Sequence, residues 1–152
     1  MSFIEAKPVM YIDMDNVIVD FPSAFKHLSD ETKAQYAGRL DEVPNIFSMM
    51  KPMRNAVQSV EALSKQFDVY VLSTAPWENR TAWSDKLDWV KKYLGSTVYK
   101  RLILSHNKHL NTGAYLIDDR LANGADRFTG EHVHFGTERF PDWASVLDYL
   151  GV

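Results

Sequence analysis

Short apolar runs alternate along the chain with stretches in which apolar residues recur at the spacing of one helix face. The runs predict strands at residues 9–12, 67–72, 102–104 and 114–117, and a further strand around Val133 and Phe135. Helices are predicted at residues 55–66, about 79–94 and 143–150. Strands that alternate with helices are typical of an α/β fold, so we predict a Rossmann-like three-layer sandwich around a mainly parallel sheet.

Within this pattern, the helix at about 79–94 has an apolar stripe that we expect to face the core: Trp83, Leu87, Val90 and Leu94. The four tryptophans (Trp77, Trp83, Trp89 and Trp143) are expected to be mainly core residues.

Residues 21–53 are weakly periodic and contain Gly38, Pro44 and, near their end, three methionines. We interpret them as a small helical cap insert that lies over the strand ends. The length of 152 residues suits one domain with one sizeable core, so residues 1–152 are expected to form a single domain that carries this insert.

Acidic and hydroxyl side chains follow three of the predicted strands. Asp13 and Asp15 come after the first strand, Thr74 after the second, and Asp118 and Asp119 after the fourth. The carboxyl ends of parallel strands form the ligand-binding edge of such sheets, so these side chains are expected to meet there. Carboxylates held this close repel one another unless a cation offsets the charge, and Mg²⁺ prefers such oxygen ligands.

An isolated Asp-x-Asp is more often a solvated turn or a helix cap than a metal site. Here the first pair ends an apolar strand, and Asp118 and Asp119 end another. Stability does not require that many carboxylates at one sheet edge, whereas a metal site does.

Composition narrows the classes of function. The chain has no cysteine, which excludes disulfides, thiolate catalysis and a cysteine-based zinc site. The net charge of −3 does not indicate a protein that binds a nucleic acid polymer. Residues 1–8 lack the apolar core of a signal peptide, and no apolar stretch is long enough to span a membrane, so we expect a cytoplasmic protein. A homodimer is compatible with the sequence.

Four motifs follow one another along the chain: the segment from Asp13 to Val17, Thr74, Lys108, and the Asp118-Asp119 pair. In their order and spacing they resemble the motifs of the haloacid dehalogenase-like (HAD) superfamily of phosphotransferases. The resemblance is closer to the 5′(3′)-deoxyribonucleotidases, through residues 13–21, 73–76, 86–90 and 116–120. Asn16 stands where that family usually has glycine, and asparagine tolerates a positive φ. Ala75 stands where that family more usually has serine, so the resemblance implies one phosphate contact fewer.

The resemblance implies a covalent phosphatase mechanism. Asp13 is expected to be the nucleophile that forms an aspartyl-phosphate. Asp15 is expected to act as general acid and then as general base, and to bind Mg²⁺ through its main-chain carbonyl. Asp119 is expected to bind the metal directly, while Asp118 is expected to be either a ligand or a support for the ligands.

The resemblance also implies phosphate contacts from Thr74, Lys108 and Lys86. Phe21, Ile46 and Phe47 fall where that family builds its pocket for the base of a nucleoside monophosphate. For Ile46 and Phe47 an equal alternative is that they pack the insert against the core. The histidines His106, His109, His132 and His134 do not form a zinc set and are expected at the surface.

Three functions are therefore considered. The leading one is a magnesium-dependent phosphomonoesterase, a 5′(3′)-deoxyribonucleotidase that acts on (deoxy)nucleoside monophosphates. The second keeps the chemistry but takes another small phosphate ester, such as a sugar phosphate. The third is a non-catalytic protein that binds a phosphate ligand, and the presence of both Asp13 and Asp15 argues against it.

Overall fold

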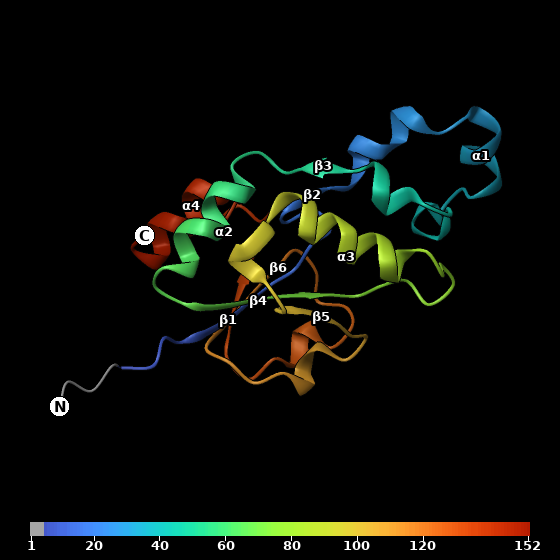
Figure 1. Cartoon of the computed structure of the whole chain (residues 1–152). Helices are drawn as coiled ribbons and strands as arrows, with labels where there is room; N and C mark the ends of the chain where they lie inside the picture. Colours follow the sequence, from blue (N-terminus) through green and yellow to red (C-terminus); the bar gives the residue numbers. More distant parts are fainter. Residues whose placement is uncertain (1–4) are drawn as a thin grey trace.

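A five-stranded parallel sheet forms the centre of the protein in the computed structural model, which describes residues 5–152 (Figure 1). The strand order is β5-β4-β1-β6-β7, and every neighbouring pair is parallel. The strands are β1 (Val9–Ile12), β4 (Asp68–Ser73), β5 (Leu102–Leu104), β6 (Tyr115–Asp118) and β7 (Glu131–His134). All five lie within about two residues of the strands predicted from the apolar runs.

Three helices cover one face of this sheet (Figure 1). They are α2 (Ala56–Ser64), α3 (Ala82–Tyr93) and α4 (Trp143–Leu150), and their buried residues share one core with alternate residues of the strands, such as Met10 and Ile12. The capping box at Asp142 begins α4 at the predicted position.

The opposite face carries a smaller apolar cluster, which includes Tyr11, Leu116 and Phe128. The 3₁₀ helices η5 (Lys108–Leu110) and η6 (Ala125–Arg127) belong to the segments on this side, and η4 (Gly95–Val98) follows α3. The prediction of a layered α/β fold with a mainly parallel sheet is confirmed.

Residues 21–50 leave the sheet through a two-stranded antiparallel ribbon of β2 (Val19–Asp20) and β3 (Lys51–Pro52). Between these strands lie η1 (Phe21–His27), α1 (Asp30–Gln35), η2 (Leu40–Glu42) and η3 (Ile46–Met49). Figure 1 shows this segment beyond one end of the sheet, on the side away from both chain termini. We call residues 21–50 the insert.

Hydrogen bonds tie the insert to the core near α3. The buried Asn79 amide donates to the carbonyls of Asp41 and Val43 at 2.8 and 3.0 Å. The Trp89 indole donates to the Met50 carbonyl at 3.1 Å. The insert is therefore held at a fixed position beside the loop that follows β4.

The apolar stripe predicted for α3 is partly wrong. Leu87 is 42% exposed and Trp83 40% exposed, whereas Lys86 is fully buried together with Ala82 and Trp89. The buried face is rotated because Lys86 has an acidic partner inside the protein, and apolar periodicity cannot reveal a buried lysine.

Residues 1–4 lie outside the described part, so the expectation of no signal peptide at residues 1–8 falls partly outside it. No helix within residues 5–152 is both long and apolar enough to cross a bilayer.

Candidate active site

The predicted acidic residues meet where the chain changes direction across the sheet. After β1 the chain continues toward β4 and β5, whereas β6 is followed by β7 on the other side of β1. Ligands of open α/β folds bind at the carboxyl ends of strands at such a switch point. The Asp13 amide donates to the Ile117 carbonyl at 2.9 Å, which sets the residues after β1 beside the end of β6.

The loop after β1 is a tight turn that begins the insert. The amides of Val17, Ile18 and Val19 all donate to the Met14 carbonyl, at 2.9 to 3.1 Å. Asn16 has φ 61°, so the asparagine adopts the left-handed conformation that glycine usually supplies. The Trp143 indole of α4 donates to the Val17 carbonyl at 2.8 Å and fixes the far side of the turn.

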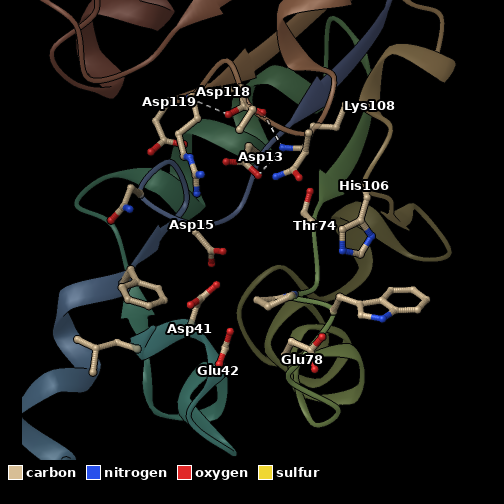
Figure 2. A pocket seen from close by; sticks show the side chains of 18 of the residues that line it. Asp13, Asp15, Asp41, Glu42, Thr74, Glu78, His106, Lys108, Asp118 and Asp119 are labelled. Atoms are coloured by element: carbon tan, nitrogen blue, oxygen red, sulfur yellow. Dashed lines mark hydrogen bonds and ion pairs between the residues drawn. The ribbon is translucent and has the colours of Figure 1, made fainter. Parts of the chain in front are cut away.

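Lys108 joins two of the aspartates. Its ammonium lies 2.9 Å from Asp13 Oδ1 and 2.6 Å from Asp118 Oδ2, and all three side chains are buried (Figure 2). Burial lowers the pKa of Lys108, but the two carboxylates outweigh it, so its pKa is raised overall. Lys108 therefore stays charged beside the predicted nucleophile.

Asp13, Asp118 and Asp119 form a cluster that could hold a metal ion, with one oxygen from each within 4.8 Å of the others. Burial and the neighbouring carboxylate of Asp13 raise the pKa of Asp118 to about 6 and that of Asp119 to about 8. Asp119 Oδ1 is buried and has no hydrogen-bond partner among the described residues. These residues fit a hard divalent cation, which would replace the bound protons and occupy the free oxygen.

Asp15 points away from this cluster and pairs with Lys86. The fully buried Lys86 ammonium lies 3.0 Å from Asp15 Oδ2 and 2.8 Å from the Ser73 hydroxyl, and 4.3 Å from the centre of the Phe47 ring. Burial raises the pKa of Asp15, Lys86 opposes that rise, and Asp13 adds to it. Lys86 thus contacts the predicted general acid, and it does not line the cavity described next.

A cavity of about 670 Å³ lies between the strand ends and the insert. In Figure 2 it opens below Asp13, Asp118 and Asp119. Its floor includes Asp13, Asp15, Thr74, Lys108 and the Asp118-Asp119 pair. The Thr74 hydroxyl donates to the Ser105 carbonyl at 2.8 Å. To donate to a ligand, the hydroxyl hydrogen must rotate away from Ser105. Both the volume and the mixed lining suit a small-molecule site.

Of the three predicted base-pocket residues, the structure brings only Phe21 to this cavity. Ile46 and Phe47 are buried, at 0% and 2% exposure, and do not line it. Their placement matches the alternative that they pack the insert: the Phe47 ring lies edge-on to Phe21 and under the Lys86 ammonium.

Other residues at the cavity were not predicted. Trp77, expected in the core, is 77% exposed and lines the cavity wall next to His106, whose ring centre lies 5.8 Å from its own. Trp77 follows Pro76 in the loop after β4, outside any helix or strand that would place its ring in the core. The position of Trp77 directly after the Thr74 motif was the feature of the sequence that could have indicated its place at the site. Three carboxylates, Asp41, Glu42 and Glu78, face the cavity from the side opposite Asp13 (Figure 2).

The histidines also differ from expectation, because His106, His109, His132 and His134 are partly buried, and His106 lines the cavity. His132 and His134 on β7 contact the main chain of Asp118 and Asp119. Burial lowers the pKa of His132, which favours its neutral form. The signal in the sequence was the alternation of two imidazoles on a strand that also carries buried apolar residues.

Known proteins resemble this chain in sequence and in fold. A sequence model of the family described as 5′ nucleotidase, deoxy (pyrimidine), cytosolic type C protein matches residues 39–148. A protein of Vibrio phage KVP40 named as a 5′(3′)-deoxyribonucleotidase is 61% identical over 144 residues, which are 95% of this chain and 85% of that protein. A Staphylococcus aureus (strain Mu50) protein with the same name is 28% identical over 128 residues, 76% of this chain and 70% of its own.

A solved structure shares the fold. The HAD-hydrolase YfnB from Bacillus subtilis, in a crystal form bound to magnesium, matches with a TM-score of 0.63 at 12% identity, over 97% of this chain and 100% of that one. The matches place the chain among enzymes, so a non-catalytic binding protein is set aside. The chain belongs to the 5′(3′)-deoxyribonucleotidase family and is a phosphoric monoester hydrolase with the HAD fold.

Proposed function

We propose that the protein is a magnesium-dependent phosphatase that hydrolyses (deoxy)nucleoside monophosphates to nucleoside and phosphate through an aspartyl-phosphate on Asp13. The observation that carries the proposal is the cluster of Asp13, Asp118 and Asp119 on the cavity floor, with Lys108 bonded to two of them. Such a floor can neutralise the charge of a phosphoryl group, which is the main requirement of phosphoryl transfer.

Asp119 suits a direct metal ligand better than Asp118 does. Both oxygens of Asp118 already accept hydrogen bonds, from Lys108 at 2.6 Å and from the Arg120 amide at 2.9 Å, whereas Asp119 Oδ1 has none among the described residues. Asp13 and the main-chain carbonyl of Asp15 complete the proposed set. A bound Mg²⁺ would supply positive charge to the phosphoryl oxygens during transfer.

In the first step a carboxylate oxygen of Asp13 bonds to phosphorus, and the bond from phosphorus to the ester oxygen breaks. Lys108 neutralises the negative charge shared by Asp13 and the phosphoryl group. Asp15 gives a proton to the departing nucleoside oxygen. In the second step Asp15 takes a proton from water, which attacks phosphorus and releases phosphate, so Asp13 is restored.

Asp15 is arranged for this exchange of a proton. Lys86 holds Oδ2 at 3.0 Å, Oδ1 has no hydrogen-bond partner among residues 5–152, and the side chain, 29% exposed, lines the cavity in which the leaving group would lie. The raised pKa of Asp15 favours a protonated acid at the start of the reaction. The contacts of Lys86 therefore support a role in positioning Asp15, in place of the direct phosphate contact expected from sequence.

The nucleoside is proposed to lie between two walls of the cavity. Phe21 and Leu40 of the insert line one wall, and Trp77 lines another. Aromatic rings stack on nucleobases with about 1–3 kcal/mol each. In this arrangement the insert acts as a small cap of the single domain, and Ile46 and Phe47 support Phe21 from behind.

The carboxylates at the cavity mouth favour a free mononucleotide over a nucleic acid polymer. Asp41, Glu42 and Glu78 would repel the flanking phosphates of a polynucleotide. A cytoplasmic location, which the lack of cysteines suits, and a homodimer complete the proposal as expectations from the sequence.

The test is phosphate release from a panel of 5′- and 3′-deoxynucleoside monophosphates, ribonucleotides and sugar phosphates, measured with Mg²⁺ and with EDTA. We expect release that requires Mg²⁺ and is fastest with deoxynucleotides. Release from sugar phosphates alone would support the second candidate, and release unaffected by EDTA would overturn the metal site.

A further inference from the structure

Two imidazoles of β7 lie against the strand that carries the metal-site aspartates. His132 and His134 alternate with the buried Val133 and Phe135, so both imidazoles lie on the sheet face opposite the helices. Their rings stack, with centres 5.1 Å apart and planes at 27°. β7 is an edge strand of the sheet and both histidines are half-buried, so the feature that sets this pair apart is the carbonyls that the two rings contact.

Each imidazole contacts one main-chain carbonyl at the end of β6. His132 Nε2 lies 3.1 Å from the Asp118 carbonyl oxygen, and His134 Nε2 lies 3.0 Å from that of Asp119. A carbonyl oxygen only accepts hydrogen bonds, so the hydrogen of each imidazole is on Nε2. Two side chains thus donate to two successive peptides at the centre of the site.

Asp118 and Asp119 differ in how many other hydrogen bonds hold them. The Asp118 carbonyl also accepts from the Phe135 amide at 3.0 Å, and the Asp118 carboxylate is held by Lys108 and the Arg120 amide. Asp119 lies one residue beyond the end of β6. Among residues 5–152, the Asp119 carbonyl accepts a hydrogen bond from His134 alone, and Asp119 Oδ1 has no hydrogen-bond partner. The direction of the Asp119 side chain therefore depends on His134 more than that of Asp118 depends on His132.

We propose that His134 is a positioning residue for the metal site: its hydrogen bond fixes the Asp119 peptide so that the Asp119 carboxylate faces Asp13 and Asp118, and the stacked His132 supports it. The inference rests on the proposed metal site. Groups that orient metal ligands typically change metal affinity by about 10–100-fold when they are removed.

The experiment compares His134→Met, which keeps the length but loses the donor, with His134→Gln, whose amide can donate from a similar position. His27→Met, at an exposed histidine of η1, is the control. Mg²⁺ affinity is measured by isothermal titration calorimetry and by the rise of the unfolding midpoint, together with KM for a deoxynucleoside monophosphate. We expect His134→Met to weaken Mg²⁺ binding by about tenfold or more with KM changed little, and His134→Gln to stay near the wild type.

Unchanged Mg²⁺ binding in folded His134→Met would overturn the inference, as would equal losses in the Met and Gln variants, since the donor would then be irrelevant. If His134→Met does not fold, ¹⁵N NMR of the metal-free wild type decides. A His134 ring with hydrogen on Nε2 and slow exchange supports the inference, and hydrogen on Nδ1 overturns it. A wild type that binds no Mg²⁺ refutes the proposed function, while the NMR result still decides whether His134 holds Asp119.

Discussion

Charged side chains of the site depend on one another at the scale of single residues. Lys108 joins Asp13 to Asp118, and Lys86 holds Asp15, so each buried lysine is matched to the carboxylates beside it. Burying one such charge without its partner is costly, so removing either member affects the other. The two lysines also separate the roles of Asp13 and Asp15, because each has a different cationic neighbour.

Asp13→Asn is expected to abolish turnover and leave the fold intact, because Lys108 keeps Asp118 as its charged partner. The amide has nearly the same shape but cannot attack phosphorus as an anion. Phosphate release from a deoxynucleoside monophosphate and the unfolding midpoint are the measurements, with Asp126→Asn, at an exposed residue of η6, as the control. Substantial activity in Asp13→Asn would contradict a covalent mechanism.

Lys86→Met is expected to lower kcat by up to the roughly 10²–10⁴-fold that a positioned acid contributes, with a smaller change in KM. Without the ammonium the pKa of Asp15 rises further, because Lys86 now opposes the rise caused by burial. The alkaline limb of the kcat–pH profile, where Asp15 must be protonated as the acid, and the acidic limb, where it must be deprotonated as the base, should therefore both shift to higher pH. Lys91→Met, on the exposed face of the same helix, is the matched control. If Lys86→Met raises KM and leaves kcat unchanged, a phosphate contact for Lys86 is favoured.

At the scale of elements, the insert and the loop after β4 form the two sides of the cavity. Asn79 and Trp89 hold the insert through its main-chain carbonyls, so its position does not depend on the side chains that face the ligand. Phe47 fills the space between η3 and α3 instead of contacting the cavity. Residues that select the substrate are therefore expected among those whose rings reach the open volume.

Trp77→Ala is expected to raise KM for deoxynucleoside monophosphates by about 5–150-fold, the equivalent of about 1–3 kcal/mol of stacking. KM for p-nitrophenyl phosphate, which carries no base, should change much less. The control is Trp83→Ala, a partly exposed tryptophan of α3 that does not line the cavity. If KM rises equally for both substrates, Trp77 supports the loop and does not contact the base.

The whole molecule has a stability that depends on whether the acidic cluster holds protons or a cation. Folding raises the pKa of Asp118 to about 6 and that of Asp119 to about 8, so the metal-free folded state binds protons more strongly than the unfolded chain. The stability from this binding is fully present below the ordinary carboxyl pKa, near 4, and is lost as pH rises through the folded values.

The EDTA-treated protein is therefore expected to become less stable between about pH 5 and pH 8. Mg²⁺ displaces the protons, so its stabilising effect should be larger at pH 8 than at pH 5.5. Unfolding midpoints across this range, with Mg²⁺ and with EDTA, test the expectation. Asp119→Asn, which resembles the protonated acid, should flatten the EDTA curve; a curve as steep as the wild type would assign the effect to other groups.

Much of the fold could be predicted because strands and helices are encoded locally. The run from Val9 to Ile12 and the helix that begins at Trp143 lie where the apolar pattern indicated. The acidic cluster could be anticipated because parallel strands bring their carboxyl ends to one edge, where Asp13, Asp118 and Asp119 now lie together. Positive φ at Asn16 agrees with the tolerance of asparagine for that conformation.

Contacts between distant segments could not be predicted in the same way. Lys86 is 71 residues from Asp15, and nothing in a helical period shows that a lysine will be buried there. The direction of Trp77, the burial of Phe47 and the contact of His134 with Asp119 likewise depend on how segments pack. The sequence by itself determined the strands, the helices and the identity of the acidic residues, because these follow from local periodicity and chain order. Only the tertiary structure decided which charges pair, which rings face the cavity and which side chains hold the aspartates, because those are outcomes of three-dimensional packing.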